Sequence, residues 1–194
     1  MPLSARFIEA LAYAADLHAT QVRKGTDIPY ISHLLAVTAL VLEHGGTEDE
    51  AIAALLHDAI EDQGGGSTRE VIRAKFGEDV VAIVDGCTDT EVTPKPPWRA
   101  RKEEYLHHLT GAPKSVALVA AADKLHNARS TLADLRGEGD AVWARFNAGR
   151  EEQLWFYRGC VEALRCRAPA PLVDELARVV DAMAGPFKTA EQPA

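Results

Sequence analysis

Apolar residues recur at helical spacing along most of this chain. Near the N-terminus, one face of a 3.6-residue repeat carries Phe7, Ile8, Leu11, Ala14, Ala15 and Leu17. The same spacing returns over residues 32–43, 101–109, 115–135 and 140–164. Strand-like alternation of apolar and polar residues does not stand out in any segment. The pattern predicts an all-α fold, a single compact array of about eight to ten helices.

Glycine, proline and capping residues divide this pattern. Gly25 and Pro29 predict a loop over residues 20–29, and three prolines predict a stiff surface loop over residues 88–98, anchored by Trp98. Thr47 and Glu50 have the spacing of a capping box, which predicts a helix that continues through residues 57–62. We expect one domain over residues 1–185, with residues 186–194 as a flexible tail.

Composition excludes several classes of protein. The net charge of −8 argues against a general nucleic-acid binder, although a local cluster of cations would still suit a small phosphorylated substrate. We expect no association with a membrane, because no apolar run approaches the ~20 residues of a membrane span and the N-terminus lacks a signal peptide's apolar core. Cys87, Cys160 and Cys166 form no ligand pattern, which suits reduced thiols and a cytoplasmic location. A homodimer is compatible with the sequence, which does not show one.

Four polar places interrupt the apolar helices and are candidates for chemistry. His57 and Asp58 end the apolar run 51–56, and a single helical turn separates them from Glu61 and Asp62. His33 stands at the start of the helix at 32–43, and Asp123 follows the apolar run 117–122. A carboxylate in such surroundings is costly to bury unless it is paired or bound to a metal.

Each of these places has an ordinary explanation when taken alone. His33 could donate to a backbone carbonyl, and His57 with Asp58 could be a hydrogen-bonded core pair. Glu61 and Asp62 could form a solvated helix end, and Asp123 could pair with a neighbouring cation. The four ordinary explanations together would require four coincidences. As a set, two imidazoles and two carboxylates suit Mn²⁺ or Fe²⁺ better than they suit a structural zinc ion.

The spacing of these residues resembles the HD-domain metal-dependent phosphohydrolases, and most closely the hydrolase domain of the RelA/SpoT homologues. The resemblance rests on Arg23-Lys24-Gly25, on Pro29 to His33, on the run His57 to Asp62 and on the run Ala122 to Arg129. These motifs span residues ~20–130. The long members of that family continue into synthetase and regulatory domains, so the resemblance is to a stand-alone small alarmone hydrolase without synthetase activity.

The resemblance implies a function and a role for each motif residue. The reaction would be metal-dependent hydrolysis of guanosine 3′,5′-bis(diphosphate), ppGpp or pppGpp, to GDP or GTP plus pyrophosphate. Its metal would be Mn²⁺, with Fe²⁺ or another divalent ion as alternatives, and its ligands would be His33, His57, Asp58 and Asp123. Glu61 and Asp62 would act on the attacking water. Contacts to the guanosine nucleotide would come from Arg23, Lys24, Asn127 and Ser130, the last standing where the family usually has a Thr.

Two other functions remain open at the level of sequence. The chain could be an HD phosphohydrolase of another nucleotide, such as a dNTP, a nucleoside monophosphate or NADPH, or a non-catalytic helical protein that binds alarmones. A second basic cluster, Arg99, Arg101 and Lys102, could clamp distal phosphates. We favour the interpretation that it is a charged helix start balanced by Glu103 and Glu104. The loop at 91–98 and the residues after ~165 match no part of the family pattern.

Overall fold

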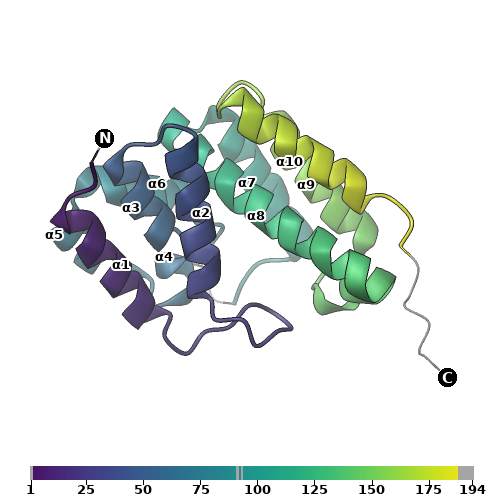
Figure 1. Ribbon diagram of the computed structural model, residues 1–194, viewed down its shortest axis with the longest axis horizontal. Helices are drawn as coiled ribbons and strands as arrows, with labels where there is room; N and C mark the ends of the chain where they lie inside the picture. The colour runs from purple at the N-terminus through teal and green to yellow at the C-terminus, as the bar shows by residue number, and fades with distance from the viewer. Residues whose placement is uncertain (1, 91, 93, 188–194) are drawn as a thin grey trace.

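The chain folds into helices that share one hydrophobic core (Figure 1). This computed structural model describes residues 2–90, 92 and 94–187, and within them it contains ten α-helices, one 3₁₀ helix and no strand. The predicted all-α fold is confirmed. The helices are α1 (Ala5–Leu17), α2 (Ile31–Glu43), α3 (Glu48–Leu56), α4 (Ala59–Asp62), α5 (Gly66–Phe76), α6 (Glu78–Cys87), α7 (Trp98–Gly111), α8 (Lys114–Glu138), η1 (Gly139–Arg145), α9 (Arg150–Leu164) and α10 (Ala170–Met183).

Helix α8 is the central element of the array. It packs against α2, α3 and α6 on one side and against α9 and α10 on the other (Figure 1). Its middle turns present alanines that are at most 1% exposed: Ala117, Ala120, Ala121 and Ala122. Small side chains allow neighbouring helices to approach closely. The alanine segment therefore brings the polar ends of α2 and α3 close to Asp123, the one acidic residue buried within α8.

The helix predicted from Thr47 through residues 57–62 is interrupted. Its start is as predicted, because the Thr47 side chain accepts from the Glu50 amide while the Glu50 side chain accepts from the Thr47 amide. However, α3 ends at Leu56, and α4 begins only at Ala59. The backbone of Asp58 has φ −97° and ψ −2°, which turns the chain between the two helices. The continuous helix was the wrong expectation, and the bend projects His57 and Asp58 toward α8.

The long helix predicted over residues 140–164 is also divided. The 3₁₀ helix η1 covers its first turns, and α9 starts at Arg150 after Gly149, whose backbone is extended. Val142 and Trp143 are buried, so packing against the core holds the 3₁₀ segment where sequence periodicity alone indicates an α-helix.

The proline-rich loop ends on an aromatic anchor, as predicted. Trp98 lies edge-on to both Trp155 and Phe156, with ring centroids 6.3 and 6.1 Å away. Residues 91 and 93 of the loop lie outside the described residues. So does most of the predicted tail, residues 188–194, and the flexible tail stays a prediction.

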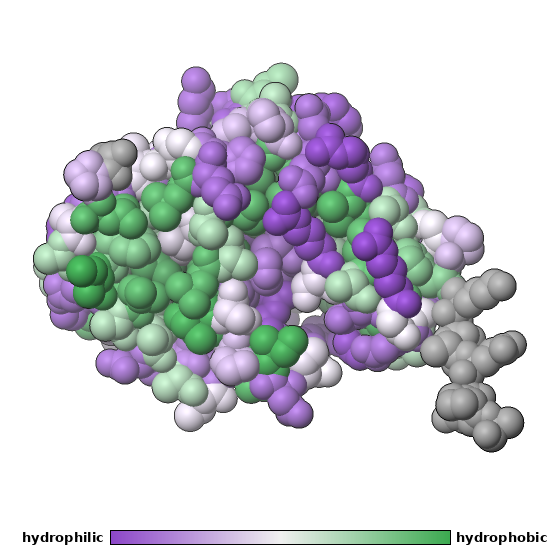
Figure 2. Space-filling view, in the orientation of Figure 1, coloured by the Kyte–Doolittle hydropathy of each residue, from purple (hydrophilic) through white to green (hydrophobic). Residues whose placement is uncertain are grey.

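The surface differs from one part of the molecule to another. The face in Figure 2 is apolar over α1 and α2, whereas hydrophilic residues gather toward the centre of the view.

None of the described helices combines the length and the hydropathy that crossing a membrane requires.

Truncating a core residue of α3 should destabilise the fold. Leu55 of α3 is fully buried, so Leu55→Ala should lower the free energy of unfolding by about 2–5 kcal/mol, through lost apolar burial and a cavity. Leu35→Ala, at a side chain that is 45% exposed, should cost less than about 1 kcal/mol. Urea unfolding followed by circular dichroism measures both, and equal losses would contradict this description of the core.

Candidate active site

Four side chains from three helical regions meet beside α8. His33 lies in the first turn of α2, His57 caps the C-terminus of α3, Asp58 forms the bend before α4, and Asp123 lies within α8. Single ligand atoms of His33, His57 and Asp58 all lie within 4.8 Å of one another. Asp123 Oδ1 is 3.2 Å from His33 Nε2 and 3.6 Å from His57 Nε2. The structure thus brings together all four residues that the sequence singles out as metal ligands.

Neighbouring groups orient these side chains. His57 Nδ1 lies 2.9 Å from the Ala54 carbonyl, which can only accept, so Nδ1 carries the hydrogen and the Nε2 lone pair faces the cluster. The Tyr30 hydroxyl donates to Asp58 Oδ2 at 2.6 Å. Asp123 accepts from Lys124 Nζ at 2.6 Å and from Asn127 Nδ2 at 2.5 Å.

The donor set fits a divalent cation. Among the described residues, the Nε2 atoms of His33 and His57 have no hydrogen-bond partner although both are buried. His57 Nε2 is only 3.0 Å from Asp58 Oδ2. Buried polar atoms without partners are costly, and a cation bound between two imidazoles and two carboxylates would satisfy them together. The chain therefore carries a His/Asp group of the metal-binding kind.

The pKa values of the two imidazoles shift in opposite directions, and each shift suits a candidate metal ligand. Burial lowers the pKa of His33, which keeps its ring neutral and able to ligate. Burial also opposes a charge on His57, but the carboxylates of Asp58 and Asp123 outweigh it and raise the pKa of His57 well above its usual value. A metal ion would take the place of that proton.

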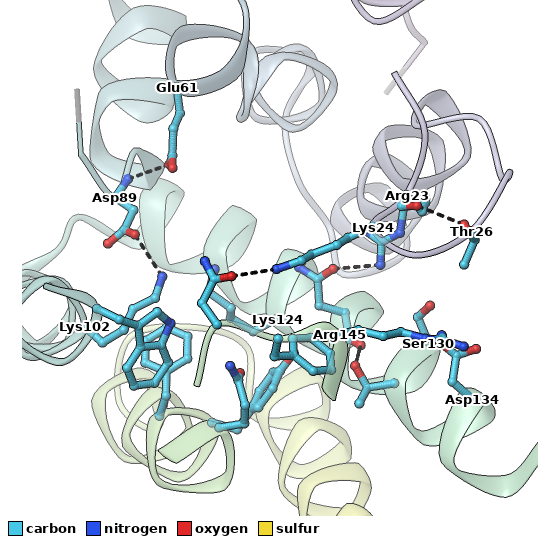
Figure 3. A pocket seen from close by; sticks show the side chains of 18 of the residues that line it. Arg23, Lys24, Thr26, Glu61, Asp89, Lys102, Lys124, Ser130, Asp134 and Arg145 are labelled. Carbon is cyan, nitrogen blue, oxygen red and sulfur yellow. Dashed lines mark hydrogen bonds and ion pairs between the residues drawn. The ribbon is translucent and has the colours of Figure 1, made fainter. Parts of the chain in front are cut away.

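A cavity of about 430 Å³ lies next to this group. Figure 3 shows side chains that line the cavity. The four candidate ligands do not line it, but Tyr30 and Asn127 do, and each of them contacts one of those ligands. Acidic side chains on its wall are Glu61, Asp89 and Asp134. Its cations outnumber them and are Arg23, Lys24, Lys95, Arg101, Lys102, Lys124 and Arg145. The cavity therefore suits an anionic ligand bound beside a metal ion.

All four residues predicted to contact the nucleotide line this cavity. Arg23 and Lys24 reach it from the loop between α1 and α2, and Asn127 and Ser130 reach it from α8. Arg23 Nη2 donates to Asn127 Oδ1 at 2.9 Å, and Lys24 Nζ donates to Asn147 Oδ1 at 3.1 Å (Figure 3). These contacts join segments far apart in the sequence.

The two predicted catalytic carboxylates have different surroundings. Glu61 lines the cavity, accepts from Lys95 Nζ at 2.7 Å and accepts from the Asp89 amide at 3.2 Å. Asp62 does not line it, and its Oδ2 accepts from Gln21 Nε2 at 2.8 Å. Burial and then the charge of Asp58 raise the pKa of Asp62, which makes it a stronger base than an exposed aspartate.

The interpretation of the second basic cluster is partly wrong. Arg99 does pair with Glu103, but it also pairs with Glu152 and lies over the Trp155 ring. Arg101 and Lys102 instead pair with Asp89, and both line the cavity. Arg99 lies on a different face of α7 from Arg101 and Lys102, and only the fold shows which face is turned toward the cavity.

Other lining residues carried no signal in the sequence. Asp89 belongs to the proline-rich loop, and Arg145 belongs to η1, where it pairs with Asp134 of α8 (Figure 3). Both segments come near the motifs only through tertiary packing. Phe156 and Tyr157 are buried in the core and also form part of the cavity wall.

Comparison with known proteins identifies the family. The sequence profile described as "HD domain" matches residues 10–154. The chain belongs to the HD-domain family. The chain is 40% identical over 129 residues to guanosine-3′,5′-bis(diphosphate) 3′-pyrophosphohydrolase MESH1 of Xenopus tropicalis. This alignment covers 65% of the chain and 69% of the relative. The chain is 34% identical over 165 residues to MESH1 of Drosophila melanogaster, covering 84% of this chain and 86% of the relative.

A solved structure extends the comparison to the fold. It belongs to a metazoan orthologue of SpoT that hydrolyses ppGpp, and it superposes with a TM-score of 0.77 at 27% sequence identity. The match covers 95% of this chain and 98% of the other. The resemblance to the hydrolase domain of the RelA/SpoT homologues is therefore confirmed, and 95% coverage means that the structural match extends into α10.

Proposed function

We propose that this HD domain hydrolyses ppGpp at the 3′-pyrophosphate and releases GDP and pyrophosphate, with GTP as the product from pppGpp. The observation that carries the proposal is the His/Asp group beside a cavity in which cations predominate. The activity named for the two MESH1 relatives supports the same reaction. A polyphosphate nucleotide carries several negative charges, and such a cavity offers both direct cationic partners and an adjacent metal ion.

The proposed metal ligands are His33, His57, Asp58 and Asp123. Two nitrogen and two carboxylate oxygen donors favour Mn²⁺, with Fe²⁺ or another divalent ion as alternatives. A bound ion of this kind supplies charge neutralisation on the phosphoryl group and lowers the pKa of a coordinated water. Tyr30 and Lys124 hold the carboxylates in place, and the Ala54 carbonyl fixes the tautomer of His57.

The nucleotide would be held by residues of the cavity wall. Arg23 can form two parallel hydrogen bonds to a phosphate or stack on the guanine ring, and Lys24 adds a point charge beside it. Asn127 and Ser130, on the same face of α8, offer an amide and a hydroxyl to the ribose and phosphates. Arg101 and Lys102 line the same cavity, where they pair with Asp89, and would bind distal phosphates.

Asp62 is the proposed base of the reaction. Both oxygens of Glu61 already accept hydrogen bonds, from Lys95 and from the Asp89 amide, whereas one oxygen of Asp62 is engaged by Gln21. Asp62 would take a proton from the attacking water. At the same time, the oxygen of that water forms a bond to the phosphorus attached to the 3′-oxygen. The phosphorus–O3′ bond then breaks, and the 3′-oxygen takes up a proton as pyrophosphate leaves. Glu61 would position the water and the loop that carries Asp89.

Removing the Arg23 guanidinium should weaken substrate use but not metal binding. Arg23→Ala is expected to lower kcat/KM for ppGpp roughly 10–100-fold, since it removes a charge-assisted phosphate contact of a few kcal/mol. Arg99→Ala, which removes a guanidinium paired with Glu103 and Glu152 outside the cavity, should change kcat/KM less than about twofold. Steady-state kinetics with Mn²⁺ measures both, and an equal effect of the two substitutions would argue against the assigned pocket.

A substrate panel tests the proposed specificity. Purified protein with Mn²⁺ should show its highest kcat/KM with ppGpp, above those for a dNTP, a nucleoside monophosphate and NADPH. A higher value for any of the other three would replace ppGpp as the substrate while leaving the metal site in place. Turnover of none of the four would favour a binding protein without catalysis.

A further inference from the structure

A histidine of α8, His126, contacts the ring of the candidate ligand His33. His126 Nδ1 is 2.7 Å from His33 Nδ1, and the ring centroids are 4.9 Å apart with an angle of 41° between the planes. His126 belongs neither to the group of candidate metal ligands nor to the cavity wall. Its contact spans 93 positions in the sequence and joins α8 to the first turn of α2.

The chemistry of this contact allows only one arrangement when a metal is bound. A ligating Nε2 must present its lone pair, so the hydrogen of a neutral His33 ring lies on Nδ1. His33 Nδ1 then donates, and His126 Nδ1 must accept with its own hydrogen on Nε2. If His126 were protonated on both nitrogens, its Nδ1–H would face the Nδ1–H of His33 and the hydrogen bond would be lost.

The other imidazole ligand is oriented in a different way. His57 donates its Nδ1 hydrogen to the carbonyl of Ala54, three residues earlier in its own helix. The carbonyl three residues before His33 is that of Tyr30, and it accepts a hydrogen bond from the backbone amide of His33. The hydrogen-bond acceptor for the His33 ring comes instead from a side chain on α8. The orientation of His33 therefore depends on one replaceable group, whereas that of His57 depends on the backbone.

We propose that His126 is a positioning residue of the metal centre, which accepts the Nδ1 hydrogen of His33 and thereby fixes both the tautomer and the direction of the His33 ring. The proposal rests on the metal site of the proposed function and is independent of its substrate. Outer partners of metal-bound histidines commonly contribute about 10–100-fold to metal affinity. We expect a contribution of that size from His126.

Three substitutions distinguish this role from simple packing. In Asn, Oδ1 is attached to Cγ as Nδ1 is in His, so His126→Asn places an acceptor close to the original position. His126→Gln places the amide one bond further out, and His126→Leu provides no acceptor. His108→Leu, at an exposed histidine of α7, is the matched control for the loss of a surface imidazole.

The measurement is the Kd for Mn²⁺ alone, from the electron paramagnetic resonance signal of free Mn²⁺. His126→Leu and His126→Gln should weaken binding roughly 10–100-fold, and His126→Asn and His108→Leu should stay within about threefold of wild type. The circular dichroism spectrum and Tm of each variant establish that it is folded. The proposal is overturned if folded His126→Leu binds as wild type does, or if Asn is as weak as Leu. Failure of the wild-type chain to bind Mn²⁺ would overturn the metal site itself, whereas failure to hydrolyse ppGpp would leave this assignment standing.

Discussion

Replacing Asp58 by Asn is expected to remove Mn²⁺ binding and to lower kcat/KM for ppGpp by at least about 10³-fold. The Asp58 carboxylate lies 3.0 Å from His57 Nε2 and 3.7 Å from His33 Nε2, so its charge is central to the ligand group. A neutral amide is a poorer metal ligand, and losing the metal forfeits several kcal/mol of charge stabilisation at the phosphoryl group. Asn has nearly the same shape and can still accept from Tyr30, so the fold should be retained.

The control for this substitution is an aspartate outside the site. Asp174→Asn, on the exposed face of α10, should leave Mn²⁺ binding and turnover within about twofold of wild type. Isothermal titration with Mn²⁺ and a pyrophosphate-release assay give the two readouts. Unchanged turnover in Asp58→Asn would show that the reaction does not depend on the His/Asp group.

Replacing Asp62 by Asn should slow the chemical step without affecting the metal. Loss of a general base typically costs about 10²–10⁴ in rate, so kcat should fall by that factor while the Kd for Mn²⁺ stays within about threefold. Because burial and Asp58 raise the pKa of Asp62, it accepts a proton more readily than an exposed carboxylate. A base must be deprotonated to act, so wild-type activity should fall as the pH drops through this raised pKa.

Glu61→Gln is the matched comparison for Asp62→Asn. It keeps the size of the side chain and changes only a group whose oxygens already accept from Lys95 and the Asp89 amide. We expect a smaller loss of kcat than in Asp62→Asn, together with a higher KM as the loop loses an ion pair. If Glu61→Gln shows the larger loss of kcat, Glu61 is the base.

The helical fold and the candidate ligand residues could be predicted from the sequence because both depend on local signals. Apolar periodicity indicated the helices, and the capping box at Thr47 fixed the start of α3. Asp123 was recognised because a carboxylate amid alanines needs a partner, and in the structure Lys124, Asn127 and the two histidines surround it.

The bend at Asp58 could not be predicted, because residues 51–62 contain no glycine or proline to interrupt a helix. Helix α3 packs against α1, α2 and α6, and the chain then turns at His57 and Asp58 toward α8. Tertiary packing overrides local propensity here, at the point where two of the candidate ligands lie.

The cavity wall could be predicted only in part. Arg23, Lys24 and Asn127 follow a motif, whereas Asp89, Lys102 and Arg145 come from a proline-rich loop, a helix start and a 3₁₀ segment. No spacing rule connects those segments, since their contacts arise from the packing of α7 and α9 and of η1 on α8. His126 was missed as a partner of His33 because the side chain that faces it is set by the crossing of α2 and α8.

Product analysis of a ppGpp reaction tests the central claim most directly. Purified chain with Mn²⁺ should convert ppGpp into GDP and intact pyrophosphate in equal amounts, resolved by anion-exchange chromatography. Chelation of the metal should stop the reaction, and renewed Mn²⁺ should restore it. Stepwise release of orthophosphate, or equal turnover with the metal chelated, would contradict a metal-dependent 3′-pyrophosphohydrolase.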